Sequence, residues 1–148
     1  MEIGKHLEHI NKLVRSKYRE TAQKHDLTLE QFHLLIELYH HHGLMVTEDI
    51  LPLTVGEIAA DIGNAPHTLS ERIKRLEKKD LIKKMRDKND QRINRVLLTD
   101  KGQRLMDSIK DESTNIFIYN ALDKIDESLL DGLLNGLKQL NENLSGNK

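Results

Sequence analysis

Hydrophobic positions near the start of the chain repeat with a helical period. They are spaced by four, three and four residues, which places them on one face of an amphipathic helix that runs to about residue 23. These positions are Ile3, Leu7, Ile10 and Val14. A capping box formed by Thr28 and Gln31 then predicts the start of a second helix, whose apolar residues lie on several sides, as expected in a core.

The middle of the chain predicts two short helices joined by a tight turn. Residues 40–52 break the periodicity and are expected to form an irregular connection. Thr54 and Glu57 then form a second capping box, and the helix that it opens ends at Gly63. Pro66 suits the first turn of the next helix, whose outward side is polar. The inward stripe of that helix consists of Leu69, Ile73 and Leu76. Two such helices are typical of a helix-turn-helix motif.

A β-hairpin is predicted after this motif. Residues 81–86 and 95–98 are strand-length apolar and basic runs, and the charged segment 87–94 between them is rich in turn-forming residues. A recognition helix followed by a hairpin indicates a winged helix-turn-helix region over residues 28–98. The expected fold class is therefore mainly α with a small β-hairpin wing (α+β).

Two helices are predicted after the hairpin. Thr99 can cap a helix that runs to about residue 120, and Asp126 can cap a last helix. Leucines in the last helix alternate at steps of three and four, which resembles the narrow seam of a coiled coil. These are Leu130, Leu133, Leu137, Leu140 and Leu144, here called the leucine seam. The 148 residues are expected to form a single domain, residues 1–148.

Composition narrows the classes of protein. Hydrophobic residues make up 37% and charged residues 32%, and no apolar run approaches the length of a membrane-spanning helix. The chain has no cysteine, which excludes disulfides and thiol chemistry. Its start lacks the order of a secretory signal, so a cytoplasmic location is expected. The net charge is only −1, but residues 64–95 hold 11 Lys/Arg against 5 Asp/Glu, a local net charge of +6.

This basic segment contains the side chains expected to bind double-stranded DNA. A helix fits the major groove and a hairpin tip fits the minor groove. The candidate residues on the recognition helix are Pro66, His67, Thr68, Ser70, Glu71, Lys74, Arg75 and Lys78, and those on the wing are Lys88, Asp90, Gln91 and Arg92. His67, Thr68, Ser70 and Glu71 suit base edges, and the three cations of the helix suit phosphates. A solvated charged face is the alternative explanation of such a cluster.

Residues 54–104 resemble the MarR family of transcriptional regulators. The resemblance is carried by T-L-S-E-R-I-K-R-L-E-K-K-D-L-I and by D-Q-R-I-N-R-V-L-L-T-D-K-G. Its most specific part is a wing signature, which consists of Asp90, Arg92, Leu98 and Thr99. The resemblance implies that Arg92 enters the minor groove and that Asp90 orients the wing by ion pairing, in agreement with the negative potential of a narrow minor groove.

The same resemblance implies a homodimer and a regulatory role. The dimer would be built from residues 1–24 and 99–148. The leucine seam is too short to stand alone, so it is expected to pack either within the monomer or, as we favour, against a partner. A twofold dimer would select a pseudo-palindromic operator. The family also implies a repressor released by a small-molecule effector, bound between the dimer helices and the winged region, with no cofactor.

Two features depart from the family pattern. Ala65 occupies a position where a capping serine is common, so Asn64 would have to cap the recognition helix. The connection over residues 40–53 is several residues longer than usual and is either an elaboration near the ligand pocket or tolerated length.

Two alternative functions remain open on the sequence. Eight histidines, including His6, His9 and the run 40–42, raise the hypothesis of a zinc-responsive regulator, although no ligand spacing supports it. A winged-helix module that binds protein without DNA specificity is a second alternative. No phosphate-binding loop, nucleophile motif or metalloprotease helix is present, so the sequence does not predict an enzyme.

Overall fold

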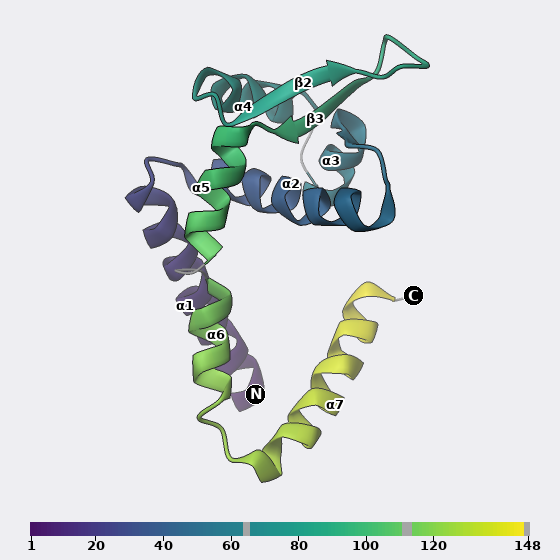
Figure 1. Ribbon diagram of the computed structural model, residues 1–148. Helices are drawn as coiled ribbons and strands as arrows, with labels where there is room; N and C mark the ends of the chain where they lie inside the picture. The colour runs from purple at the N-terminus through teal and green to yellow at the C-terminus, as the bar shows by residue number, and fades with distance from the viewer. Residues whose placement is uncertain (64–65, 111–113, 147–148) are drawn as a thin grey trace. The chain divides into compact units, whose positions relative to one another are not determined.

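The computed structural model describes residues 1–63, 66–110 and 114–146 (Figure 1). The chain divides into two units, residues 1–113 and 114–148, which are described separately. The first unit contains α1 (Glu2–Lys24), α2 (Leu29–Glu48), β1 (Leu53–Thr54), α3 (Val55–Ile62), α4 (Pro66–Lys78), β2 (Ile82–Arg86), β3 (Asn94–Leu98) and α5 (Asp100–Lys110). The second unit contains α6 (Thr114–Leu122) and α7 (Glu127–Ser145). No helix within the described ranges is long and apolar enough to cross a membrane.

Both predicted capping boxes are present. The backbone N–H of Gln31 donates to Thr28 Oγ1, and the N–H of Thr28 donates to Gln31 Oε1, each over 3.1 Å. Thr54 and Glu57 make the same reciprocal pair at the start of α3, each bond 3.0 Å long. Gly63 ends α3 with φ of 79°, a left-handed conformation that glycine adopts without strain. α2 and α3 therefore begin where the sequence predicted.

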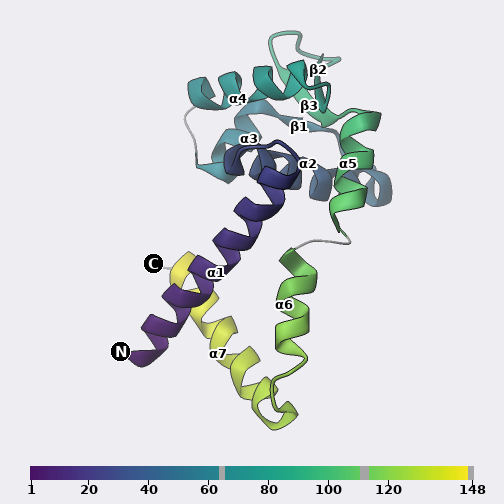
Figure 2. The same cartoon turned by 90° about the vertical axis from the view of Figure 1, so that its left-hand side faces the viewer.

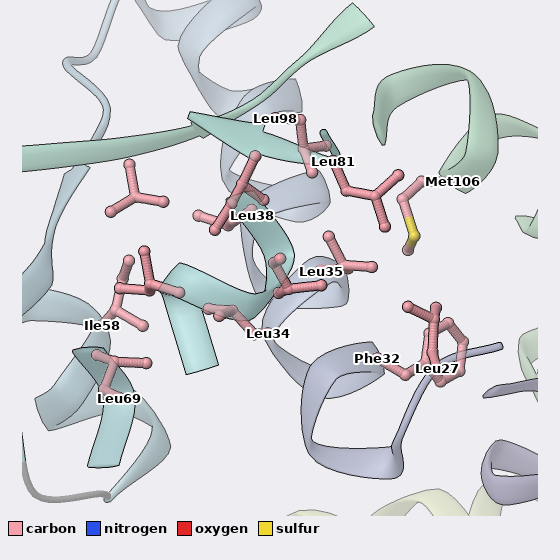
Figure 3. Packing of buried hydrophobic residues seen from close by; sticks show 14 of the residues in the cluster. Leu27, Phe32, Leu34, Leu35, Leu38, Ile58, Leu69, Leu81, Leu98 and Met106 are labelled. Carbon is pink, nitrogen blue, oxygen red and sulfur yellow. The ribbon is translucent and has the colours of Figure 1, made fainter. Parts of the chain in front are cut away.

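The core of the first unit lies around α2. Leu34, Leu35 and Leu38 of this helix are buried and pack with side chains from α3, α4, the hairpin and α5 (Figure 3). Ile58 of α3 and Met106 of α5 lie at opposite ends of the view in Figure 3. Burial of one such aliphatic side chain contributes about 1.5–3 kcal/mol, so this cluster is the main stabilising element of the unit.

The hairpin belongs to a three-stranded antiparallel sheet of order β1-β3-β2. Ile82 is opposite Leu98, and Lys84 is opposite Val96. Because side chains alternate between the two faces of a strand, Ile82 and Val96 face the core while the tip of the hairpin extends beyond it. Figure 2 shows α4 running beside this hairpin within the first unit.

The prediction of an irregular connection over residues 40–52 was wrong for most of its length. α2 continues through this segment to Glu48, and Asp49 ends it with φ of 55°. Leu44 and Val46 are exposed, so this part of α2 has no regular buried face. Its sequence therefore lacks the helical spacing of apolar residues on which the prediction depended. The remainder leads into β1, a strand of two residues that is too short to show a period and that was not predicted.

The helix predicted from residue 99 to about 120 lies partly outside the described residues. α5 ends at Lys110 and α6 begins at Thr114, with residues 111–113 outside the described part of the chain. The cap proposed at Asn64, and Ala65 after it, likewise lie outside the described residues.

The second unit is an open helical pair. Asp126 caps α7, as predicted, by accepting a hydrogen bond from the N–H of Ser128 over 3.2 Å. α7 contains no buried residue, and Leu137 of the leucine seam is 41% exposed. α1 in the first unit also exposes its apolar face, including Ile3 and Ile10. Each unit therefore carries an exposed apolar helix face.

Candidate nucleic-acid interface

The exposed face of α4 carries the predicted recognition residues. Leu69, Ile73 and Leu76 are at most 1% exposed, which fixes the rotation of the helix on the core. The opposite face is exposed and consists of His67, Thr68, Ser70, Glu71, Lys74, Arg75 and Lys78. Pro66 is the first residue of α4, as its position in the sequence predicted. Lys74 and Glu71 form a loose ion pair of 3.7 Å, which leaves both side chains free to exchange partners.

The wing tip is organised around Asp90 and Arg92. Arg92 donates from Nε to Asp90 Oδ1 over 3.1 Å and from Nη2 to Oδ2 over 3.2 Å, so the pair is bidentate. The backbone N–H of Arg92 also donates to Asp90 Oδ1. These bonds lower the pKa of Asp90, first through the Arg92 side chain, and they raise the pKa of Arg92. The guanidinium is 90% exposed, so it is held in place yet open to a ligand.

The base of the wing is held by Asp87 and Arg95. Arg95 Nε donates to Asp87 Oδ1 over 2.7 Å, while Asp87 Oδ2 accepts the N–H groups of Asn89 and Asp90. The bond from Arg95 is the main cause of the lowered pKa of Asp87. Arg95 Nη1 also donates to the carbonyl of Pro52, which ties the wing to the segment before β1. Sequence reasoning did not identify this arrangement.

The second half of the wing signature fixes the end of β3 to α5. Thr99 Oγ1 donates to the carbonyl of Asp80 over 2.6 Å and accepts the N–H of Gly102 over 3.0 Å. Thr99 thus caps α5, as predicted, and also fastens the loop that precedes β2. Gly102 approaches the backbone of Leu81 so closely that a Cβ there would lie 2.1 Å from the Leu81 carbonyl oxygen.

A cleft of about 400 Å³ lies between α4 and the wing. It is called the wing-side cleft, and its lining residues are Thr54, Val55, Gly56, Ser70, Ile73, Lys84, Arg92, Ile93 and Asn94. The structure thus brings two predicted site residues, Ser70 of α4 and Arg92 of the wing, to one cleft. It adds Lys84 and Asn94, which no sequence motif had singled out, and Thr54, which the sequence had indicated only as a helix cap.

A second cleft of about 340 Å³ lies on the other flank of α4, beside the start of α2. It is called the α2-side cleft, and its lining residues are Thr28, Glu30, Gln31, His67, Thr68, Glu71, Arg72 and Arg75. Four predicted recognition residues therefore gather there. The predicted wing residues Lys88 and Gln91 are exposed and line neither cleft.

The histidines do not form a metal centre in the described part of the chain, where no three His, Asp or Glu side chains converge as metal ligands. His41 Nε2 lies 2.8 Å from the Leu51 carbonyl oxygen. His33 makes an edge contact with the ring of Tyr18, and burial lowers its pKa. These contacts give His33 and His41 structural roles within the first unit.

The fold is that of a winged helix-turn-helix protein, in which α3 and α4 form the motif and β2 and β3 the wing. Solved structures of this fold include Staphylococcus aureus MepR in a DNA complex, with a TM-score of 0.74, 23% identity and coverage of 94% of this chain and 96% of that one. FabT of Streptococcus pneumoniae, also in a DNA complex, has a TM-score of 0.77 at 19% identity, covering 97% and 95%. A MarR family protein from Bacillus stearothermophilus has a TM-score of 0.75 at 22% identity, covering 98% and 94%. The expected MarR-like fold is confirmed.

The chain belongs to the SarA/Rot family of transcriptional regulators, whose sequence model matches residues 16–109. Among curated relatives, the HTH-type transcriptional regulator SarZ of Staphylococcus haemolyticus is 29% identical over 133 residues, which is 90% of this chain and 82% of that protein. YsmB of Bacillus subtilis, an uncharacterized HTH-type transcriptional regulator, is 28% identical over 108 residues, 73% of this chain and 68% of that protein. The predicted role in transcription regulation is confirmed by the family.

Proposed function

We propose that this regulator binds double-stranded DNA sequence-specifically, with α4 in the major groove and the wing tip in the adjacent minor groove. The observation that carries the proposal is the wing-side cleft, because it places Ser70 of α4 and Arg92 of the wing on two walls of one feature. A helix of this width fits the major groove, and an exposed arginine on a hairpin tip suits the negative potential of a narrow minor groove. The solved DNA complexes of MepR and FabT, which share the fold, support DNA binding.

The predicted residues divide into two roles in this proposal. His67, Thr68, Ser70 and Glu71 near the start of α4 read base edges, where one well-placed bidentate contact contributes about 1–3 kcal/mol of discrimination. The cations Lys74, Arg75, Lys78 and Lys88 bind phosphates and make the affinity sensitive to salt. On the wing, Gln91 lies beside the Asp90–Arg92 pair, and Asp90 acts by orienting the guanidinium.

The proposal includes a homodimer. The exposed apolar faces of α1 and α7 lie in residues 1–24 and 99–148, and a second copy of the chain would bury them. A twofold dimer presents two α4 helices about 34–36 Å apart, one turn of DNA, and therefore selects a pseudo-palindromic operator. We further propose that the protein acts on chromosomal DNA in the cytoplasm as a repressor that a small molecule releases, with no catalytic step.

Selection of duplexes from a random library with the purified protein tests this function. The expected result is enrichment of one sequence with approximate twofold symmetry, bound with an affinity that falls steeply as salt rises. Retention of every duplex equally, or of none at low salt, would contradict the proposal. The second of these results would favour a winged-helix module that binds protein.

A further inference from the structure

The wing-side cleft separates the two elements that the proposed function assigns to different grooves of the duplex. Ser70 and Ile73 of α4 form one wall, and Arg92, Ile93 and Asn94 of the wing form the other. In B-DNA, a single sugar-phosphate strand forms the ridge between a major groove and the adjacent minor groove. A protein that fills both grooves must therefore accommodate that strand between its two reading elements.

We propose that the wing-side cleft holds this sugar-phosphate strand, and that Lys84 and Asn94 bind one of its phosphates. The inference rests on the proposed function and adds two contact residues and a docking site to it. Lys84 supplies a point charge, and the Asn94 side-chain amide supplies a hydrogen-bond donor. The phosphate contact fixes the distance between the recognition helix and the wing on the duplex.

The charge of the lining residues makes the wing-side cleft a better phosphate-binding site than the α2-side cleft. The lining of the wing-side cleft includes Lys84 and Arg92 and no acidic residue among the described side chains. The α2-side cleft combines two arginines with Glu30 and Glu71, whose carboxylates would repel a phosphate. The two clefts are similar in size, about 400 and 340 Å³, so their charge rather than their volume separates them.

The strand register explains why Lys84 reaches the cleft. Lys84 is opposite Val96 and shares its strand face with Ile82, the face that packs toward α4. Lys83 is opposite Leu97 and therefore lies on the other face of the hairpin. Lys84 is therefore the proposed contact residue, and Lys83, its neighbour on the same strand, is a matched control.

In the free protein, Lys84 is held near the cleft only by a weak ion pair. Its Nζ lies 3.6 Å from Glu77 Oε1 of α4, and both side chains are about one third exposed, at 36% and 33%. A partly exposed ion pair of this length contributes little to stability, so a phosphate can replace the carboxylate or share the Lys84 ammonium with it. Glu77 is therefore a positioning residue, and its removal does not abolish the contact.

The test compares Lys84→Gln, Lys83→Gln and Glu77→Gln in the full-length protein, with the duplex that the wild type selects. We expect Lys84→Gln to weaken binding about threefold to tenfold and to reduce the slope of log affinity against log salt by about 0.9, the value for one lost phosphate contact. The sequence preference should not change. Lys83→Gln should keep the wild-type slope, and Glu77→Gln should bind at least as tightly as the wild type.

A second arm locates the contact on the DNA. A duplex with one neutral methylphosphonate, moved along the strand between the two grooves, should weaken wild-type binding at one position where Lys84→Gln loses nothing further. Absence of such a position, equal slopes for Lys84→Gln and Lys83→Gln, or a loss in Glu77→Gln equal to that in Lys84→Gln would overturn the inference. Failure of the wild type to prefer any duplex would instead contradict the proposed function, so the two failures are distinguishable.

Discussion

Arg95 Nε lies 2.7 Å from Asp87 Oδ1, and this pair joins the base of the wing to the segment before β1. Asp87 also accepts the N–H groups of Asn89 and Asp90 with its other oxygen. One carboxylate therefore organises both the anchor of the wing and the turn that carries Asp90.

Replacement of Asp87 should loosen the wing tip without unfolding the first unit. We expect Asp87→Ala to accelerate amide hydrogen exchange at Asn89 and Asp90, because their acceptor is removed, while the core amides of α2 keep their protection. The lowered pKa of Asp87 gives the sign of the pH effect. Its stabilising contribution is complete above the unfolded pKa of about 3.9 and is lost as the pH falls through the folded pKa. Equal exchange in wild type and variant would show that the carboxylate does not order the turn.

Gly102 should tolerate no side chain. A Cβ would lie 2.1 Å from the Leu81 carbonyl oxygen, so Gly102→Ala requires α5 to move away from the loop before β2. We expect a loss of roughly 1–3 kcal/mol in the free energy of unfolding, measured by urea denaturation. Unchanged stability would mean that the two segments do not approach each other in this way.

Gly43→Ala, in contrast to Gly102→Ala, should increase the free energy of unfolding, and it tests the extension of α2. A Cβ at Gly43 meets no atom within 4 Å, and Gly43 lies inside α2 rather than in the connection predicted from the sequence. Alanine should therefore stabilise the protein by about 0.5–1 kcal/mol, the difference in helix propensity, in the same urea measurement. A destabilised variant would argue against a helix at this position.

Replacement of Glu37 by glutamine should stabilise the protein at neutral pH. Burial raises its pKa from the ordinary value of 4.5, and Asp61 opposite raises it further, while His40 and His41 oppose the shift. A raised carboxyl pKa means that stability falls as the pH rises from the unfolded pKa through the folded one. We expect Glu37→Gln to raise the melting temperature at pH 7 and to lose this advantage at pH 4. An advantage that is equal at both pH values would exclude titration of Glu37 as its cause.

The leucine seam should hold the proposed dimer. Leu133 and Leu137 are about 40% exposed on α7, at 38% and 41%, so a charge at both positions would face the partner. We expect the double change to glutamate to raise the dimer dissociation constant at least about a hundredfold in analytical ultracentrifugation. Gln139→Glu adds one such negative charge at an exposed position outside the seam and should leave the dimer intact. If the dimers of both variants dissociated, added charge alone, rather than loss of the seam, would control assembly.

The sequence predicted the elements that local chemistry determines. The reciprocal caps at Thr28 and Thr54 lie within three residues of their partners, and the hairpin has a clear strand and turn composition, so both were predicted. The resemblance likewise implied that Asp90 orients the wing by ion pairing, and the structure pairs it with Arg92.

The features that the sequence did not predict depend on long-range contacts. Arg95 reaches Pro52 across more than forty residues, a contact for which no local pattern exists. Lys84 and Asn94 enter the wing-side cleft because of strand register, whereas in the sequence they are two basic or polar residues among many. The extension of α2 was missed because its exposed apolar residues pack on no core.

The most direct measurement of the central claim is the affinity of Arg92→Ala for the selected duplex, compared with wild type and Lys83→Ala. Both variants lose one positive charge from the same hairpin, but only Arg92 lies at the tip that enters the minor groove. The account predicts a loss of at least about tenfold for Arg92→Ala, equivalent to about 1.4 kcal/mol, with fold and dimer unchanged, and a much smaller loss for Lys83→Ala. An Arg92→Ala protein that binds the duplex as tightly as the wild type would contradict it.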